Sequence, residues 1–508
     1  GGGNTTAPTT GASSGGETQT ASESAESGKI IKTDIIVGQA ADIVTLDPAG
    51  QQDTTSGVLM KHAYSTLLDV DNEGKVVPDL AESYEMKSDT EYVFKLREDA
   101  CFWDGTPVTA QDVKFSLDRA KGMPKTKSNT SKIEEVTVNG DHEVTIKLTE
   151  PYAAFKTIVT QHNLSILSEK AVTEAGDSYG DVDNLLGSGP FKVTEWVPND
   201  HYTLVRNDNY WGEMPIATSI TCRVIPEGSA RTIALEAGEI DVVWSVDPTD
   251  CANVESNPDV KLLSQPSTGI DYVGMNTQKE KFSDKRVRQA INYALDKQTF
   301  VDTIIEGRGL VANSYINAAI PGWTDEVEAY PYDPEKAKEL LAEAGYPDGF
   351  ECSIFVNGDL RTRSAQILQA QLADVGIKVD ISTYEWGALL DTLNAGEHEM
   401  FLLGWSNTSF DPDGSTYQLF YSGNHGATGN RAFFSNDKVD ELILSAQRES
   451  EESKRMELYK ELQFVLHDES PWCPLYYKEN NVGVRADLKG FTLHAGAQHY
   501  LGNCHYEE

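Results

Sequence analysis

Residues 362–386 read "TRSAQILQAQLADVGIKVDISTYEW", a helix pattern followed at once by a strand pattern. Apolar residues recur at helical spacing as far as Leu372, and Gly376 stands where a helix is expected to stop. Residues 377–382 then alternate apolar and polar side chains, which is typical of a strand. This succession predicts an α/β lobe, in which helices cover a sheet.

The same alternation of helix and strand begins at about residue 284. In "FSDKRVRQAINYALDK" (282–297) the apolar side chains fall on one helical face. In "DPEKAKELLAEAGYPDG" (333–349), Asp333 is the expected cap, Pro334 the first helical residue and Gly345 the end. One further long helical stretch is predicted over about 437–467.

Strand patterns dominate both ends of the folded chain. They include "DIIVGQ" (34–39) and "HEVTIKLTEP" (142–151), with a helix expected from about Thr109 between them. The segment after residue 471, "WCPLYYKENNVGVRADLKGF", returns to a strand pattern. A chain that begins and ends in strands around a central α/β lobe indicates a discontinuous first lobe. Hinged proteins of this kind hold ligands in the cleft between their lobes.

Length and charge narrow the class of protein. A chain of 508 residues is too long for one core, so two or three lobes are expected. The net charge of −38, from 80 acidic and 42 basic residues, excludes a general nucleic-acid-binding protein. Apolar runs such as "MFLLGW" (400–405) are far shorter than the roughly 20 residues that span a bilayer.

Residues 1–33 are rich in Gly, Ser, Thr, Ala and Glu, a composition that predicts a disordered, flexible tether. It resembles the linker after the lipid-bearing cysteine of a bacterial lipoprotein, although that cysteine is absent here. The protein is therefore expected to be extracytoplasmic (periplasm or cell surface) and lipid-anchored to the outer face of the cytoplasmic membrane.

The six cysteines show neither a CxxC motif nor a Cys/His spacing that would bind a metal. Cys352 and Cys473 lie in strand patterns and are expected to be buried free thiols. One disulfide among the other four stays open as an alternative.

The stretch "MFLLGWSNTSFDPDGS" (400–415) has two interpretations. It is either a strand that leaves the core through ordinary turn formers or a strand whose end forms the wall of a pocket. On both interpretations Asp413 is expected to face solvent or to form a turn.

Seven blocks along the chain resemble one known family. They are "LDP" (46–48), "FWDGTPVTAQDVKFSL" (102–117), "GSGPFKV" (187–193), "NYWG" (209–212), "DKRVRQAINYALDK" (284–297), "YDPEKAKELLAEAGYPDG" (332–349) and "MELYKELQFVLHDESP" (456–471). Together they resemble the extracytoplasmic solute-binding proteins of the peptide/nickel ABC importer family, over about residues 35–505. The stretch 383–405, "TYEWGALLDTLNAGEHEMFLLGW", is very similar to the dipeptide-binding subgroup.

This resemblance implies an α/β, two-lobed, hinged fold of the periplasmic-binding-protein type, with a third, smaller domain inserted in the discontinuous first lobe. The expected base lobe is 34–75, 187–266 and 478–508, the inserted domain is 76–186 and the second lobe is 267–477. Hinges are expected in 264–276 and 474–481. The implied function is capture of di- or oligopeptides and their delivery to an ABC permease and its ATPase, by a monomer without catalysis.

The resemblance also implies which side chains bind the two charged ends of a peptide. In the relatives, an acidic residue three positions after the tryptophan binds the amino group, and here that position is Thr408. Asp411 is the nearest carboxylate and either substitutes for it or holds a turn. Arg363, with Arg361 two positions before it, matches an arginine near the ligand's carboxylate, whereas the alternative for Arg363 is a surface ion pair.

The remaining expected contacts are aromatic walls and hydroxyl groups. Trp405 and Trp386 are the expected walls, Tyr272 lies near the first hinge, and Ser409 belongs to the loop after Trp405. The first-lobe edge of the cleft is expected at Thr54, Thr55 and Ser56, which alternatively cap the following helix.

Two other kinds of cargo, and an enzyme as another class of protein, are the alternatives to a peptide-binding protein. A non-peptide or modified-peptide solute (glutathione, an opine or a sugar) is the alternative to a peptide cargo, because Thr408 lacks the charge of the acid that binds the amino group in the relatives. A nickel chelate is less favoured because the ten histidines show no ligand spacing, so neither a metal nor a cofactor is expected. An enzyme is not expected because the chain contains no GxSxG, HExxH, phosphate-loop or CxxC motif.

Overall fold

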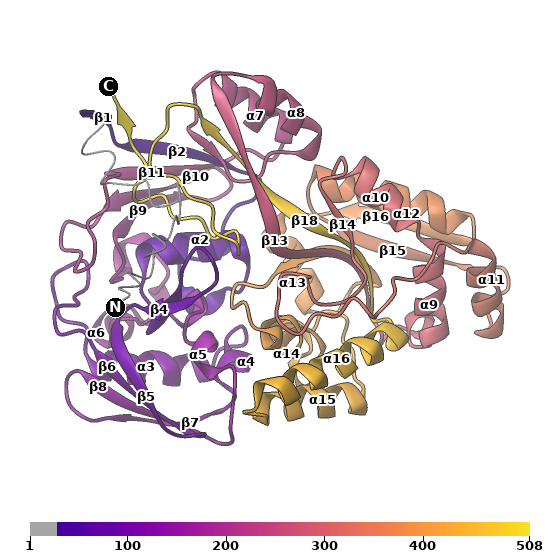
Figure 1. Ribbon diagram of the computed structural model, residues 1–508, viewed down its shortest axis with the longest axis horizontal. Helices are drawn as coiled ribbons and strands as arrows, with labels where there is room; N and C mark the ends of the chain where they lie inside the picture. The colour runs from indigo at the N-terminus through magenta and orange to yellow at the C-terminus, as the bar shows by residue number, and fades with distance from the viewer. Residues whose placement is uncertain (1–27) are drawn as a thin grey trace, which may run out of the picture.

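The computed structural model describes residues 28–508, and its main feature is one mixed sheet of eleven strands that runs through both lobes (Figure 1). The strand order is β16-β15-β17-β13-β18-β12-β2-β11-β10-β9, and β14 pairs with β18. The strands are β2 (Asp34–Gln39), β9 (Phe191–Val197), β10 (His201–Arg206), β11 (Ser219–Val224), β12 (Val242–Val243), β13 (Val260–Met275), β14 (Gly309–Val311), β15 (Phe350–Val356), β16 (Ile377–Thr383), β17 (Met400–Ser406) and β18 (Trp472–Arg485).

Two long strands, β13 and β18, cross the middle of the molecule and connect the lobes (Figure 1). They pair antiparallel from Val260 opposite Arg485 to Gly274 opposite Trp472. The register shifts between Pro266 and Ile270, where the ladder is interrupted. The segments 264–276 and 474–481, expected as hinges, lie on these two strands.

The second lobe is packed on both faces of its part of the sheet. Met400 and Leu402 of β17 belong to one core, and Phe401 and Leu403 belong to the opposite one. The first core includes α9 (Lys285–Ala294), α10 (Lys297–Thr303), α11 (Pro334–Glu343) and α12 (Asp359–Ala373), and the second includes α14 (Tyr417–Phe420), α15 (Asp437–Arg448), α16 (Glu452–Glu469) and α13 (Trp386–Asn394). Burial on both faces explains why "MFLL" shows no polar alternation.

The residues predicted to start and stop helices in the second lobe are confirmed in these roles. Asp333 accepts a hydrogen bond from the backbone N–H of Lys336 at 3.0 Å and caps α11. Gly376, with φ of +90°, follows α12, and a Cβ at Gly349 would lie 1.9 Å from the carbonyl oxygen of Gly376. The helical stretch expected over about 437–467 is confirmed as helical, but it is interrupted, since α15 ends at Arg448 and α16 begins at Glu452.

The first lobe contains a separate four-stranded sheet with its own core. Its order is β5-β6-β8-β7, and it packs with α3. These elements are β5 (Ala81–Ser88), β6 (Glu91–Leu96), β7 (Ile133–Val138), β8 (Glu143–Leu148) and α3 (Ala110–Lys121). The helix expected from about Thr109 is confirmed as α3, and Thr109 and Asp112 form a capping box at its start.

The remaining elements surround these sheets. The helices are α2 (Thr54–Ala63), α4 (Lys127–Thr130), α5 (Phe155–Ile158), α6 (Glu169–Ala175), α7 (Gly228–Glu236) and α8 (Pro248–Ser256), and the strands are β3 (Leu68–Val70), β4 (Val76–Pro78), β1 (Ile30–Lys32) and β19 (Tyr506–Glu507). Because β1 pairs with β19, regular structure begins before the expected boundary at residue 34. Residues 1–27 of the expected tether lie outside the described residues.

The six thiols are all free in the structure. Cys352 and Cys473 are buried, which confirms the expectation for both. Of the other four, Cys101 is partly exposed, and the disulfide left open by the sequence is not formed among them.

Candidate ligand-binding site

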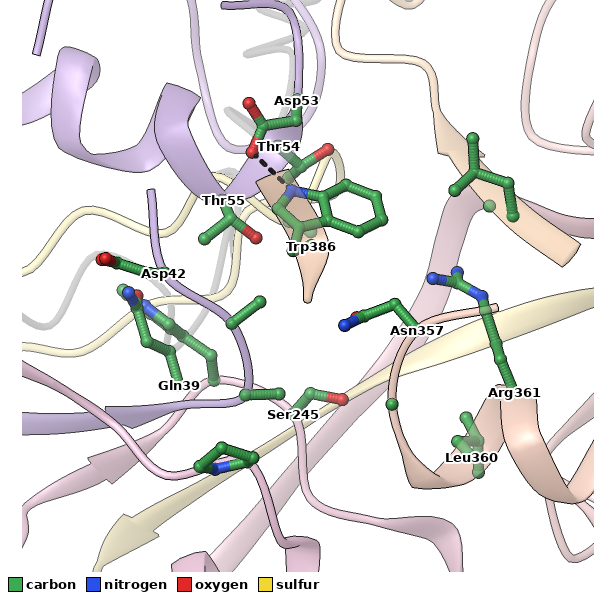
Figure 2. Close-up of a pocket in the computed structure, with 18 of the residues that line it drawn as sticks. Gln39, Asp42, Asp53, Thr54, Thr55, Ser245, Asn357, Leu360, Arg361 and Trp386 are labelled. Atoms are coloured by element: carbon green, nitrogen blue, oxygen red, sulfur yellow. Dashed lines mark hydrogen bonds between the residues drawn. The ribbon is translucent and has the colours of Figure 1, made fainter. Parts of the chain in front are cut away.

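A cavity of about 1040 Å³ lies between the two lobes. The first-lobe wall includes Gln39, Asp42, Asp53, Thr54, Thr55 and Ser245, and the second-lobe wall includes Asn357, Leu360, Arg361 and Trp386 (Figure 2). Trp405 also lines the second-lobe side. Its volume lies at the upper end of the range for small-molecule sites. Contributions from both lobes mean that the site is complete only when the lobes are together.

The first turn of α2 faces this cavity. Thr54 and Thr55 line it, as the sequence predicted. Asp53 caps the helix by accepting from the backbone N–H of Ser56 at 3.0 Å. The same carboxylate oxygen accepts from the indole N–H of Trp386 at 3.2 Å, across the lobe boundary (Figure 2). The α2 cap thereby fixes the position of a second-lobe aromatic wall.

Trp405 lies two residues beyond the buried part of β17 and lines the cavity with Gly404. Its indole N–H donates to the carbonyl oxygen of Gly414 at 2.9 Å, which holds the ring against the loop that follows. Of the two interpretations of 400–415, the pocket wall is the one that the structure shows for Trp405.

Thr408 and Ser409 line a second cavity of about 30 Å³, which Trp405 separates from the first. The Thr408 hydroxyl donates to Oε1 of Gln161 at 2.6 Å, and that of Ser409 donates to Oδ1 of Asn407 at 2.8 Å. A cavity of this size holds about one water molecule. Position 408 therefore contacts the first lobe rather than the large cavity.

Two expected contacts have charged partners and are absent from the linings of both cavities. Asp411 forms a two-point ion pair with the buried Arg455, at 2.6 and 2.9 Å. Arg363 pairs with Asp247 at 3.1 Å. Asp411 therefore has the turn role and Arg363 the ion-pair role that the sequence offered as alternatives to ligand contact.

Two more of the expected ligand contacts, Tyr272 and Ser56, are also absent from the linings of both cavities. The Tyr272 ring is buried and stacks on Trp472, with 3.4 Å between ring centroids. The Ser56 hydroxyl is buried and accepts from the backbone N–H of Val44 at 3.0 Å. Both side chains are committed to the fold in this conformation.

Asp413 was expected to face solvent or form a turn, and the solvent-facing expectation was wrong. Its side chain is buried, accepts from Gln447 Nε2 at 2.9 Å and receives a short hydrogen bond from the Tyr152 hydroxyl of the first lobe. Burial, together with the charge of Asp411, raises the pKa of Asp413 to about 6. The carboxylate is thus a buried bridge between the lobes.

Asp271 of β13 is a cavity residue that the sequence reasoning missed. Its carboxylate contacts Arg361 at 3.3 Å and Lys478 at 3.2 Å, and it accepts from the Tyr476 hydroxyl at 3.1 Å. Burial opposes ionisation, but the two cations outweigh it and lower the pKa of Asp271 to about 2. A Cβ at Gly404 would lie 2.4 Å from Arg361 Nη2, so glycine leaves room for this cluster.

Residues 28–508 contain neither a membrane-spanning helix nor a cluster of metal ligands. No helix there is both long and apolar enough to cross a bilayer. The same residues contain no group of three or more His, Cys, Asp or Glu side chains placed to hold a metal ion.

Known proteins share this architecture over nearly the whole chain. The family model "Bacterial extracellular solute-binding proteins, family 5 Middle" matches residues 75–427. The glutathione-binding protein GsiB of Escherichia coli (strain K12) is 31% identical over 479 residues, which are 91% of this chain and 92% of that protein. The dipeptide-binding protein of the same strain is 30% identical over 470 residues, covering 85% and 86% of the two chains.

The fold matches a solved structure as well. The periplasmic binding protein DppA from Helicobacter pylori, in complex with the peptide STSA, superposes with a TM-score of 0.89 at 28% identity. The match covers 94% of this chain and 98% of that one. With the family model, the identities and the interlobe cavity in agreement, the chain belongs to the bacterial extracellular solute-binding proteins of family 5.

Proposed function

We propose that this protein is the substrate-binding component of an ABC importer. It captures a short peptide or a peptide-like solute between its lobes and delivers it to the permease and ATPase subunits. The observation that carries the proposal is the cavity of about 1040 Å³, which has aromatic and charged walls from both lobes. A solute enclosed there contacts both lobes at once and stabilises their closed arrangement.

The proposed contacts are Thr54, Thr55, Trp386 and Trp405, all of which line the large cavity. The indole rings supply flat apolar walls, and the α2 hydroxyls supply hydrogen-bonding groups, a combination common in small-molecule sites. The protein carries its cargo as a monomer and without chemical change to it.

The proposed domains are a base lobe (34–75, 187–266 and 478–508), an inserted small domain (76–186) and a second lobe (267–477). The separate core of the four-stranded sheet supports the inserted domain, and the shifted register of β13 and β18 supports a hinge. The family's extracellular description supports a site outside the cytoplasm, and we propose lipid anchoring through the N-terminal segment.

A second candidate cargo is a modified peptide such as glutathione. Thr408 replaces the acid that binds the amino group in the dipeptide-binding relatives, and it contacts Gln161 rather than the large cavity. The name of the relative GsiB, a glutathione-binding protein, is in line with this candidate.

A thermal-shift screen tests the proposal. The purified protein is heated with dipeptides, tripeptides, their N-acetylated forms, glutathione and Ni²⁺ chelates, because a ligand that binds only the folded state raises the Tm. A shift with free dipeptides that N-acetylation abolishes supports an ordinary peptide cargo. A shift with acetylated peptides or glutathione supports the second candidate, and no shift with any peptide or glutathione refutes both.

A further inference from the structure

Six cationic side chains line the large cavity. Four of them form ion pairs with carboxylates of the protein or donate hydrogen bonds to its backbone carbonyls. Arg361 and Lys478 share Asp271, and Arg308 pairs with Glu255. Arg231 donates to the backbone carbonyls of residues 225, 226 and 245 at 2.8, 3.0 and 3.2 Å. The other two are Lys125 and Arg431.

Arg431 is a buried cation without a counter-ion. Only 5% of the residue is exposed, and its guanidinium makes one hydrogen bond, from Nε to Asn394 Oδ1 at 3.1 Å. Within residues 28–508 it forms no ion pair. Its remaining donors belong to a side chain that lines the cavity. Burying a charge that no ion pair compensates is costly, and an anion from outside the chain would supply that compensation.

Lys125 lines the same cavity from the other lobe. It follows α3 in the first lobe, whereas Arg431 precedes α15 in the second. Lys125 has neither an ion pair nor a hydrogen bond to any residue that the structure describes. Burial lowers the pKa of Lys125, and the nearby charge of Arg431 lowers it further while Asp53 and Asp391 act in the opposite direction.

We infer that the cargo carries an anionic group, a carboxylate in a peptide-like ligand, that binds Arg431 and is shared with Lys125 when the lobes close. This inference deepens the proposed function and rests on it. A guanidinium offers two parallel donors to a carboxylate, and the ammonium of Lys125 adds a point charge from the opposite lobe. An anion at this position adds its attraction for both cations to that of Asp53, whose charge acts on each of them, and so favours closure.

This anchor differs from the one predicted from the sequence. Arg363 was the expected partner of the ligand's carboxylate, but its partner is Asp247 and it does not line the cavity. The inference therefore assigns recognition of the anion to a different part of the second lobe, next to Asn394 at the end of α13.

The test compares acids with their neutral derivatives. Calorimetry measures the binding of Ala-Ala and its C-terminal amide, and of glutathione and its diethyl ester, to the wild type and to Arg431→Gln. The wild type is expected to bind the free acid more tightly than its neutral derivative. R431Q is expected to lose roughly 10- to 100-fold in affinity for the acid, but less than threefold for the neutral derivative. Arg286→Gln, at an arginine paired with Asp284 on the surface, is the matched control and leaves both affinities unchanged.

A second readout separates a binding role from a structural one. Because Arg431 has no counter-ion among residues 28–508, ligand-free R431Q is expected to melt at or above the wild-type Tm. The inference is overturned if the wild type binds amide or ester as tightly as the acid, or if R431Q keeps the preference for the acid. If no panel member binds the wild type, the proposed function fails and the inference, which rests on it, fails with it. If panel members bind the wild type without a preference for the acid, the inference alone fails.

Discussion

The substitution Asp271→Asn tests how much the buried charge cluster at the hinge strands contributes to stability. Asn has the same shape and keeps one acceptor, but it leaves Arg361 and Lys478 without their shared counter-charge. The difference between the ordinary Asp pKa of 3.8 and the value of about 2 corresponds to about 2 kcal/mol at neutral pH. Breaking a buried pair by removing one partner costs up to about 5 kcal/mol. We therefore expect D271N to lower the free energy of unfolding by about 2 to 5 kcal/mol.

Urea unfolding at pH 7, followed by tryptophan fluorescence, measures this loss. The control is Asp208→Asn, because Asp208 is 80% exposed and pairs with Arg206 at 3.0 Å, an arrangement worth at most about 1 kcal/mol. The folded-state pKa of Asp271 is depressed, so its contribution is present above the unfolded pKa near 3.8 and is lost as the pH falls toward 2. The difference between wild type and D271N should thus be constant from pH 7 to 5 and shrink below pH 4. Equal unfolding free energies for D271N and D208N would refute the reasoning.

Three further outcomes are expected. Asp413 has a raised folded-state pKa of about 6, so the wild type loses stability as the pH rises from 4 to 7 and this group ionises. In urea unfolding, the free energy of unfolding of Asp413→Asn should therefore rise by about 3 kcal/mol relative to that of the wild type across this range, and a pH-independent difference would contradict this. Trp386→Phe removes the interlobe hydrogen bond to Asp53 and should raise the Kd of the ligand found by thermal shift about fivefold in calorimetry, with an unchanged Kd as the contrary result. Arg363→Ala removes a partly exposed pair with Asp247 and should change that Kd less than fivefold, whereas a loss above 30-fold would restore Arg363 as a ligand contact.

Local signals in the sequence predicted the helices and the α/β class because they act over a few residues. Asp333 and Pro334 start α11, and Gly376 follows α12, since caps and glycines act on the adjacent turn alone. The break between α15 and α16 was missed because Glu449 and Glu451 are compatible with a helix, so no Gly or Pro marked the end.

The site was predicted less completely, because charge partners come from distant segments. Asp271 and Lys478 are 207 positions apart and meet only because β13 and β18 pair. Nothing in the local sequence shows that Asp411 is held by Arg455, or that Arg431 has no such partner. Trp386 and Trp405, by contrast, were predicted from their family resemblance, and both line the cavity.

The paired crossing of β13 and β18 also limits how the cavity can change. Two hydrogen-bonded strands bend readily across their plane, but sliding along each other would break many ladder hydrogen bonds together. A hinge motion that bends this pair therefore keeps the two walls in the same register along the strands. Substitutions of wall residues outside β13 and β18 leave this pairing in place, so the solute preference can change while the connection between the lobes stays the same.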